Sequence, residues 1–281
     1  MNEALLDPAI GRELGETAEG AALSVGQQLR DAFRHAGPVG TKRDFHDVVT
    51  DHDRRSEETI RKYLLSRVPD CQICGEELGV EGQADLVWYI DPIDGTNNFI
   101  SGIPFFCVSI GAAWKRQLVA GVIYDPIREE LFSASARGVY CNGTPIVSSG
   151  PLNERECTLV TSYPSHRRWD YPPDDRTDVE RFTEMVSCFR SVRNLGSAAL
   201  SLAYVAAGRA GVAFNSSISP WDVAAGILMI EQAGGVYIPL PATEPHRQAP
   251  WLAPGFLAHV GGFDLEQSCM AAIARAGLPP S

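Results

Sequence analysis

Apolar residues recur at helical spacing in two segments near the N-terminus. The first set predicts an opening amphipathic helix and consists of Ala18, Ala22, Val25, Leu29 and Phe33. The second set predicts a helix that Pro69 ends, and it consists of Ile60, Leu64, Leu65 and Val68. Glu57 and Glu58 fall in the first turn of this second helix, where negative charge favours helix formation.

Short apolar runs bounded by turn residues come next. Residues 86–90 predict a buried strand, and three later runs predict an antiparallel meander over 105–114, 118–124 and 131–135. After Gly150 the pattern changes to short strands at 159–160 and 191–192. These alternate with predicted helices over 178–188, 197–207, 222–233 and 264–276. Such alternation is typical of an α/β layer.

We therefore expect a single domain over residues 1–281. Its N-terminal α+β half spans about 1–150 and its C-terminal α/β half about 151–281. Segments 171–175 and 239–254 are rich in proline and are predicted to form surface loops.

Charge and composition narrow the class of partner. The net charge is −11 and the pI about 5.0, and lysine and arginine form no block, so we expect no nucleic-acid partner. The N-terminus has no signal-peptide pattern, and the longest apolar stretch is interrupted by Gly208-Arg209, so we expect no membrane association. Of the seven cysteines, only Cys71 and Cys74 have metal or redox spacing, and we expect a structural role for them in a cytoplasmic protein.

The candidate chemistry begins where the first predicted strand ends. Asp91 and Asp94 flank Pro92, which is expected to stop the strand's hydrogen-bond ladder, and Gly95 favours a tight turn. Two carboxylates at a rigid turn can converge on one cation, and the turn's N–H groups can meet an anion. Buried charges need partners, and no cationic residue lies nearby in the sequence. This stretch therefore predicts a metal-assisted phosphoryl site.

Three more acids lie where predicted elements begin or end: Asp53, Glu76 and Asp222. Taken alone, Asp53 and Asp222 are helix N-cap candidates and Glu76 is a loop acid. Competing motifs fail on spacing: haloacid dehalogenases need Asp-x-Asp, and an EF-hand starting at Asp91 would need glycine at Thr96. There is also no Walker loop or dinucleotide-binding fingerprint.

Four segments occur together in a recognisable order. They are residues 42–53 (Lys-x4-Asp-x-Val-Thr-x2-Asp), Gly75-Glu76-Glu77, Asp91-Pro-Ile-Asp-Gly-Thr-Asn-Asn-Phe99, and Trp221-Asp-Val-Ala-Ala-Gly226 with the trailing residues 231–235. Together they resemble the signatures of the inositol monophosphatase superfamily of Mg²⁺-dependent, lithium-sensitive phosphatases. The resemblance implies a layered α/β/α/β/α sugar-phosphatase fold. It also implies hydrolysis of a small phosphate monoester, inositol monophosphate first, with two or three Mg²⁺ ions and no covalent intermediate.

The resemblance also implies a role for each site residue. Glu76, Asp91 and the Ile93 carbonyl would hold the ion that activates water, and Asp91 would bridge to a second ion held by Asp94 and Asp222. Thr96, hydrogen-bonded to Asp53, would orient the attacking water. The substrate would contact Asp94, Gly95, Thr96, Gly196, Ser197, Ala198, Asn215 and Asp222.

The chain departs from the family at the substrate end. Inositol phosphatases carry a glutamate seven residues before the second-signature aspartate, and Asn215 occupies that position here. Histidinol phosphate, fructose 1,6-bisphosphate and 3′-phosphoadenosine 5′-phosphate therefore stay open as substrates. A non-catalytic, metal-binding regulatory or scaffold protein is the alternative from another class. Because family members are often dimers, we expect a homodimer.

Overall fold

The computed structural model describes residues 7–35, 39–41, 48–164 and 178–276. Its larger sheet has eight strands in the order β10-β9-β8-β7-β6-β5-β3-β4, and neighbours are antiparallel except β3 and β5. The strands are β3 (Gln72–Gly75), β4 (Gly79–Glu81), β5 (Leu86–Asp94), β6 (Cys107–Trp114), β7 (Gln117–Asp125), β8 (Glu130–Ser135), β9 (Gly138–Cys141) and β10 (Thr144–Pro145). The predicted meander is therefore confirmed as β6, β7 and β8.

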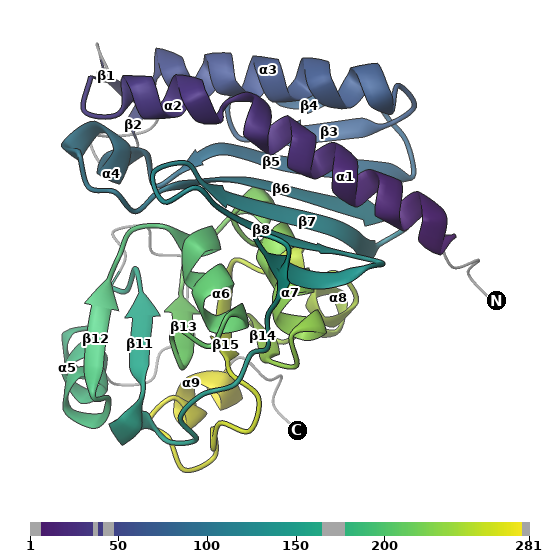
Figure 1. Cartoon of the computed structure of the whole chain (residues 1–281). Coiled ribbons are helices and arrows are strands. Elements are labelled where there is room, and N and C mark those ends of the chain that lie inside the picture. Colours follow the sequence, from purple (N-terminus) through teal and green to yellow (C-terminus); the bar gives the residue numbers. More distant parts are fainter. Residues whose placement is uncertain (1–6, 36–38, 42–47, 165–177, 277–281) are drawn as a thin grey trace.

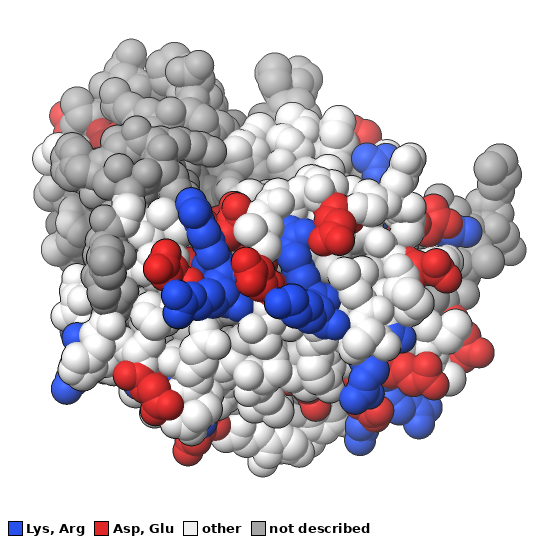
Figure 2. Space-filling view, turned by 90° about the horizontal axis from the view of Figure 1, so that it is seen from above, with Lys and Arg blue, Asp and Glu red and all other residues white. Residues whose placement is uncertain are grey.

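One face of this sheet is covered by three helices, α1 (Pro8–Ser24), α2 (Gly26–Ala32) and α3 (Asp51–Arg67) (Figure 1). Their apolar side chains pack with Trp88, Ile90 and Ile110 from the strands into one buried cluster. The short strands β1 (Val39–Thr41) and β2 (Val48–Thr50) pair with each other and lead into α3. On the outer side of these helices, basic and acidic side chains alternate (Figure 2).

Two helices separate the large sheet from a second one (Figure 1): α6 (Ala198–Ala206) and α7 (Pro220–Gln232). The second sheet has the order β12-β11-β13-β15-β14 and mixes parallel and antiparallel pairs. Its strands are β11 (Thr158–Thr161), β12 (Ser191–Asn194), β13 (Val212–Asn215), β14 (Val236–Leu240) and β15 (Gly255–His259). Helices α5 (Asp178–Cys188) and α9 (Ala271–Ala276) complete the outer layer, which confirms the predicted layered α/β fold.

The remaining elements are short. They are α4 (Thr96–Ser101), α8 (Glu244–Gln248) and the 3₁₀ turns η1 (Glu154–Glu156) and η2 (Pro250–Leu252). No helix in the described part of the chain is both long enough and apolar enough to cross a bilayer. The predicted loop 171–175 lies outside the described residues.

Two predictions about the N-terminal half were wrong in detail. The opening helix is divided into α1 and α2 at Val25, where Gly26 lies too close to the Tyr124 ring to carry a side chain. The ladder of β5 does not stop at Pro92. Asp91 pairs with Ser109 and Asp94 with Cys107, so Pro92 and Ile93 form a bulge. A bulge tolerates proline because the bulged residue needs no ladder hydrogen bond.

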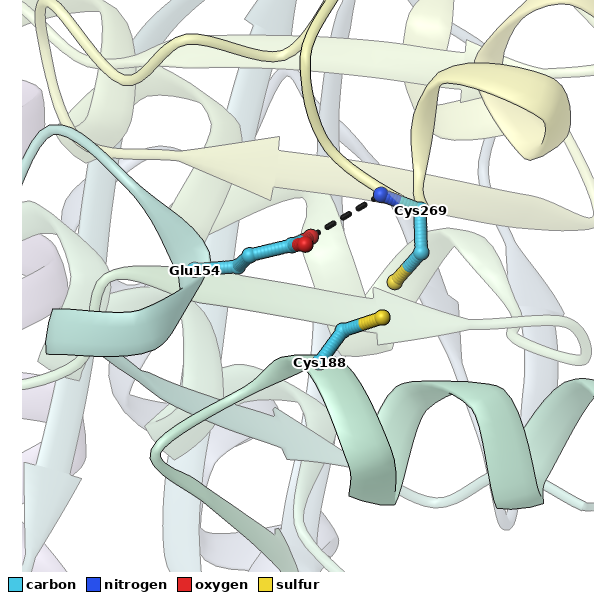
Figure 3. Close-up of side chains that lie close together, drawn as sticks. All are labelled: Glu154, Cys188 and Cys269. Carbon is cyan, nitrogen blue, oxygen red and sulfur yellow. Dashed lines mark hydrogen bonds between the residues drawn. The ribbon is translucent and has the colours of Figure 1, made fainter.

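Two more corrections concern the C-terminal half. Segment 239–254 is not simply a surface loop, because it contains the end of β14, α8 and η2, and Trp251 is buried with its indole N–H donating to Tyr89 Oη. The helix predicted over 264–276 is confined to Ala271–Ala276. The Glu154 carboxylate accepts the Cys269 N–H and thus takes a donor that a longer helix would have used (Figure 3).

Candidate active site

The bulge in β5 sets the direction of the two acids that the sequence singled out. The Asp91 carboxylate accepts the N–H of Ile93 at 2.9 Å, so the side chain itself closes the turn. Asp91 is 3% exposed and Asp94 is 8% exposed. Both carboxylates are therefore held out of solvent at the end of a buried strand.

Helix α7 brings Asp222 to the same place. The sequence suggested an N-cap, but Asp222 is the third residue of α7, and its Oδ2 accepts the N–H of Ser219 at 2.7 Å. The helix can approach the large sheet because Gly111 faces it: a Cβ on Gly111 would lie 2.6 Å from the Cβ of Ala224. The close packing of α7 against β6 thus delivers Asp222 to the end of β5.

Asp91, Asp94 and Asp222 form what we call the carboxylate trio, because each places an oxygen within 4.8 Å of the others. Burial raises the pKa of Asp91 well above its ordinary value, and the Glu76, Asp94 and Asp222 carboxylates raise it further. Burial and the charges of Asp94 and Glu76 likewise raise the pKa of Asp222. The pKa of Asp94 rises to about 6, mainly through burial. Three carboxylates in this arrangement repel one another when ionised.

Asp94 joins the two halves of the protein. Its Oδ2 accepts the Ser197 hydroxyl at 2.6 Å and the Ala199 N–H at 2.7 Å, and its Oδ1 accepts the Ala198 N–H at 3.3 Å. These donors form the first turn of α6, where the helix dipole favours an anion. The structure therefore brings the predicted segment 196–198 directly onto a predicted metal ligand.

The Thr96 hydroxyl and a fourth carboxylate, the buried side chain of Asp53, lie beside the trio. Thr96 Oγ1 is 3.0 Å from Asp53 Oδ1 and 3.1 Å from the Ile93 carbonyl oxygen, and it can donate its proton to either. Asp53 Oδ2 accepts both the N–H and the hydroxyl of Thr50. The contact between Thr96 and Asp53 is the one that the resemblance implies, while its catalytic role stays a prediction.

Glu76 follows β3, and its backbone N–H donates to the Ile90 carbonyl, next to Asp91. The turn between β3 and β4 carries Glu76, and the sequence did not indicate that Glu57 holds this turn in place. Glu57, fully buried in α3, accepts the N–H groups of Glu77 and Leu78 and pairs with Arg61 at 2.7 Å. Gly75 is required there because a Cβ would overlap the Glu57 carboxylate. The buried Glu57–Arg61 pair therefore positions the turn that carries Glu76.

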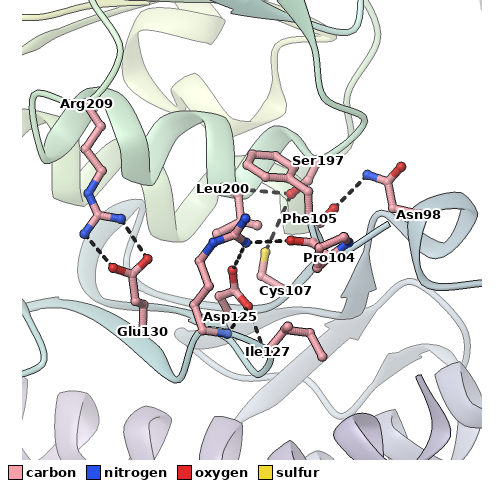
Figure 4. Close-up of polar contacts among 11 residues, drawn as sticks. Asn98, Pro104, Phe105, Cys107, Asp125, Ile127, Glu130, Ser197, Leu200 and Arg209 are labelled. Carbon is pink, nitrogen blue, oxygen red and sulfur yellow. Dashed lines mark hydrogen bonds and ion pairs between the residues drawn. The ribbon is translucent and has the colours of Figure 1, made fainter. Parts of the chain in front are cut away.

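Gly95 lies where three segments meet. Its φ of 101° is left-handed, and a Cβ would lie 3.1–3.2 Å from the Phe105 and Gly196 carbonyl oxygens. Asn98 bridges the same segments by donating to the carbonyl of Phe105 (Figure 4) and to that of Leu195, each at 2.7 Å. The Arg128 guanidinium donates to the carbonyl of Pro104, the residue before Phe105. This network places Gly95 and Gly196 side by side.

The trio fits a divalent cation. Carboxylate and carbonyl oxygens are the ligands that Mg²⁺ prefers, and the Ile93 carbonyl lies within the same turn. Within the described residues, no lysine or arginine forms an ion pair with the trio. A cation would offset the burial and the repulsion between neighbouring carboxylates that together raise the pKa values of these three groups.

Comparison with known proteins identifies the family of this chain. Residues 11–269 match the model of the inositol monophosphatase family. The chain belongs to this family. It is accordingly a phosphatase, a phosphoric monoester hydrolase.

Three family members illustrate the similarity. The protein named Nus factor SuhB of Pseudomonas aeruginosa is 38% identical over 223 residues, 77% of this chain and 81% of that protein. The inositol monophosphatase of Mesembryanthemum crystallinum is 37% identical over 233 residues, 78% of this chain and 83% of that protein. The solved IMPase of Thermotoga maritima aligns with a TM-score of 0.79 at 29% identity, covering 93% of this chain and 95% of that one.

Lys42 and Asp47 of the first signature lie outside the described residues. Asn215, which replaces the family glutamate, is 3% exposed, and its Oδ1 accepts the Ser162 N–H at 2.6 Å. Its side-chain oxygen thus already links β13 to the segment after β11, and a substrate contact through Asn215 stays a prediction.

Proposed function

We propose that this family member hydrolyses a small phosphate monoester with Mg²⁺, and that inositol monophosphate is the first substrate to test. The observation that carries the proposal is the convergence of three carboxylates, two of them buried and that of Asp222 half-buried, beside the Thr96–Asp53 pair. Enzymes of this class must neutralise phosphate charge and supply an attacking water. The trio and the Thr96 hydroxyl offer groups for these two tasks.

The metal ligands in this proposal are Glu76, Asp91, the Ile93 carbonyl, Asp94 and Asp222. Bound Mg²⁺ would lower the pKa of water and neutralise charge on the attacking and leaving oxygens. Asp94 already accepts three donors at the start of α6, so its carboxylate is held in one orientation. We propose two or three ions, as the family resemblance implies.

Thr96 is proposed to orient the attacking water. When the Thr96 hydroxyl donates to Asp53, its oxygen lone pairs face away from that bond and can accept a hydrogen bond from water. Asp53 is fixed in turn by two hydrogen bonds from Thr50. Because burial raises the pKa of Asp53, this carboxylate is a better proton acceptor than an exposed aspartate.

The substrate end of the proposal is the region around Gly95, Gly196 and Asn215. The left-handed Gly95 leads into the first turn of α4, where backbone N–H groups of Gly95 and Thr96 are proposed to bind phosphate. Ser197 and Ala198 hold Asp94 and are proposed to line the alcohol side. Histidinol phosphate, fructose 1,6-bisphosphate and 3′-phosphoadenosine 5′-phosphate are the alternative substrates.

A second candidate function rests on the Pseudomonas relative, whose name describes a Nus factor. A regulatory role as a protein partner is compatible with hydrolysis and could also exist without it. Retention of the trio and of the Thr96–Asp53 pair supports catalysis. We further propose a cytoplasmic homodimer, in keeping with the family and with seven unpaired cysteines.

The test is phosphate release from inositol 1-phosphate and the three alternative substrates, with Mg²⁺, with chelator and with added Li⁺. We expect one ester to be preferred and its hydrolysis to stop when Mg²⁺ is chelated. Chelator-resistant hydrolysis would contradict the metal mechanism. No hydrolysis of any ester would instead favour the regulatory role.

A further inference from the structure

A second group of metal-ligand side chains lies in the C-terminal half. Glu154 of η1, Cys188 at the end of α5 and Cys269 before α9 each place a ligand atom within 4.8 Å of the other two. Figure 3 shows the two thiol groups facing each other beside the carboxylate. All three residues are half-buried, so an ion could reach them from solvent.

Backbone contacts fix this arrangement. One carboxylate oxygen of Glu154, Oε2, accepts the Ser268 hydroxyl at 2.7 Å and the Cys269 N–H at 2.9 Å. The Glu154 carbonyl accepts the Arg190 N–H at 3.0 Å, two residues beyond Cys188. The segments that carry both cysteines are thus tied to Glu154 by hydrogen bonds. These bonds also keep residues 264–270 out of the helix that the sequence predicts.

We propose that Glu154, Cys188 and Cys269 bind one thiophilic divalent cation, with Zn²⁺ as the most suitable ion. Two sulfur ligands and one carboxylate are a zinc donor set, and a water can complete the tetrahedron. Soft thiolate ligands select Zn²⁺, whereas the all-oxygen trio suits Mg²⁺. The site is built from different elements than the trio and is independent of the proposed phosphatase mechanism.

A disulfide between Cys188 and Cys269 is the competing use of the two thiols. It would involve only two of the three side chains. The third, a carboxylate, adds negative charge that attracts a cation and contributes nothing to a disulfide. A bound ion would join η1, α5 and the C-terminal segment and would stabilise the folded state by ligand binding.

Co²⁺ titration of the full, reduced protein in saturating Mg²⁺ tests the proposal. We expect one equivalent of Co²⁺ to produce thiolate-to-cobalt charge-transfer absorption, which Zn²⁺ then abolishes by displacement. Cys188→Ser and Cys269→Ser should each remove this absorption. Cys141→Ser is the matched control, since Cys141 is also half-buried but its Sγ contacts Arg209, and it should leave the absorption unchanged.

Glu154→Gln keeps both sulfurs and an oxygen that can accept the Cys269 N–H, so it tests the third ligand without removing the turn's anchor. We expect it to weaken Co²⁺ binding by at least the roughly 10–100-fold that outer-shell changes cost metal sites. Wild-type protein without charge-transfer absorption at saturating Co²⁺ would overturn the proposal. Absorption that persists in both serine variants would do the same.

Discussion

Asp53 and Asp222 occupy the same position, the third residue, in two unrelated helices. In each, one carboxylate oxygen accepts the backbone N–H three residues earlier, at Thr50 and Ser219. This capping bond fixes the side chain and leaves the second oxygen for the site. The helix-capping and the functional interpretations of these residues therefore apply together, one to each oxygen.

Asp91 has the most acidic surroundings of the trio, and Asp91→Asn tests its role. We expect a loss of kcat/KM of at least about 100-fold, because several kcal/mol of charge stabilisation would be lost and 1.36 kcal/mol is tenfold. Without metal, the variant should unfold at the same temperature as wild type or higher, since one buried repulsive charge is gone. Asp85→Asn, at an exposed site, is the control. Near-normal turnover by Asp91→Asn would contradict the assignment.

Thr96 can be tested by separating its hydroxyl from its shape. Thr96→Val removes the hydrogen bond to Asp53 and should lower kcat by about 10²–10⁴-fold, the range for general acid–base groups. Thr96→Ser keeps the hydroxyl and should retain most of kcat. Steady-state kinetics at saturating Mg²⁺ distinguishes the two variants. A Thr96→Val variant that keeps kcat, or that loses no more than Thr96→Ser, would contradict a role for the hydroxyl.

At the scale of elements, α3 supports the site through Glu57, whose neighbour Glu58 is the same residue type. Glu57 and Glu58 are neighbours, but Glu57 is fully buried against Arg61 and the turn after Glu76, while Glu58 is exposed. Removing one partner of a buried ion pair leaves an uncompensated charge. Glu57 lies three residues before Ile60 and therefore on the packed face of α3, and the β3–β4 hairpin supplies the N–H groups that its carboxylate accepts.

Glu57→Gln is therefore expected to destabilise the protein by on the order of 3 kcal/mol and to raise the Mg²⁺ concentration needed for half-maximal activity. Glu58→Gln, the adjacent control, should change neither quantity. Chemical denaturation and Mg²⁺ titration of activity measure the two effects. If both variants responded alike, the hairpin would not depend on Glu57.

At the scale of the whole molecule, metal binding and stability should be linked through pH. Burial raises the pKa values of Asp91, Asp94 and Asp222 above the ordinary value of 3.8, to about 6 for Asp94. Their contribution to stability is then complete below the unfolded pKa and is lost as pH rises through the folded one. Mg²⁺ reverses this loss because it favours the ionised carboxylates.

We therefore expect the Tm difference between protein in Mg²⁺ and protein in chelator to grow from pH 4 to above pH 6. Thermal unfolding across this range measures it. The same series on Asp91→Asn should give a smaller increase. A difference that stays constant with pH would mean that the trio is not the stabilising metal site.

The sequence by itself determined the local elements and the identity of the acids. Hydrophobic periodicity placed α5 over residues 178–188, as found, and located the β6–β8 meander. Residue type and short spacing were enough to select Asp91 and Asp94, because two carboxylates at a rigid turn carry their chemistry locally. Asp222 looked like a helix N-cap by itself and was selected through the family resemblance.

The tertiary structure alone decided which distant groups meet. It placed Asp94 on the first turn of α6, gave the Glu57 carboxylate the N–H groups of the turn after β3, and brought Cys188 and Cys269 together beside Glu154. It also shortened the last helix by giving the Cys269 N–H to that carboxylate. Periodicity reports only which face of an element is buried, whereas these contacts arise from how separate elements pack, and no local pattern encodes that.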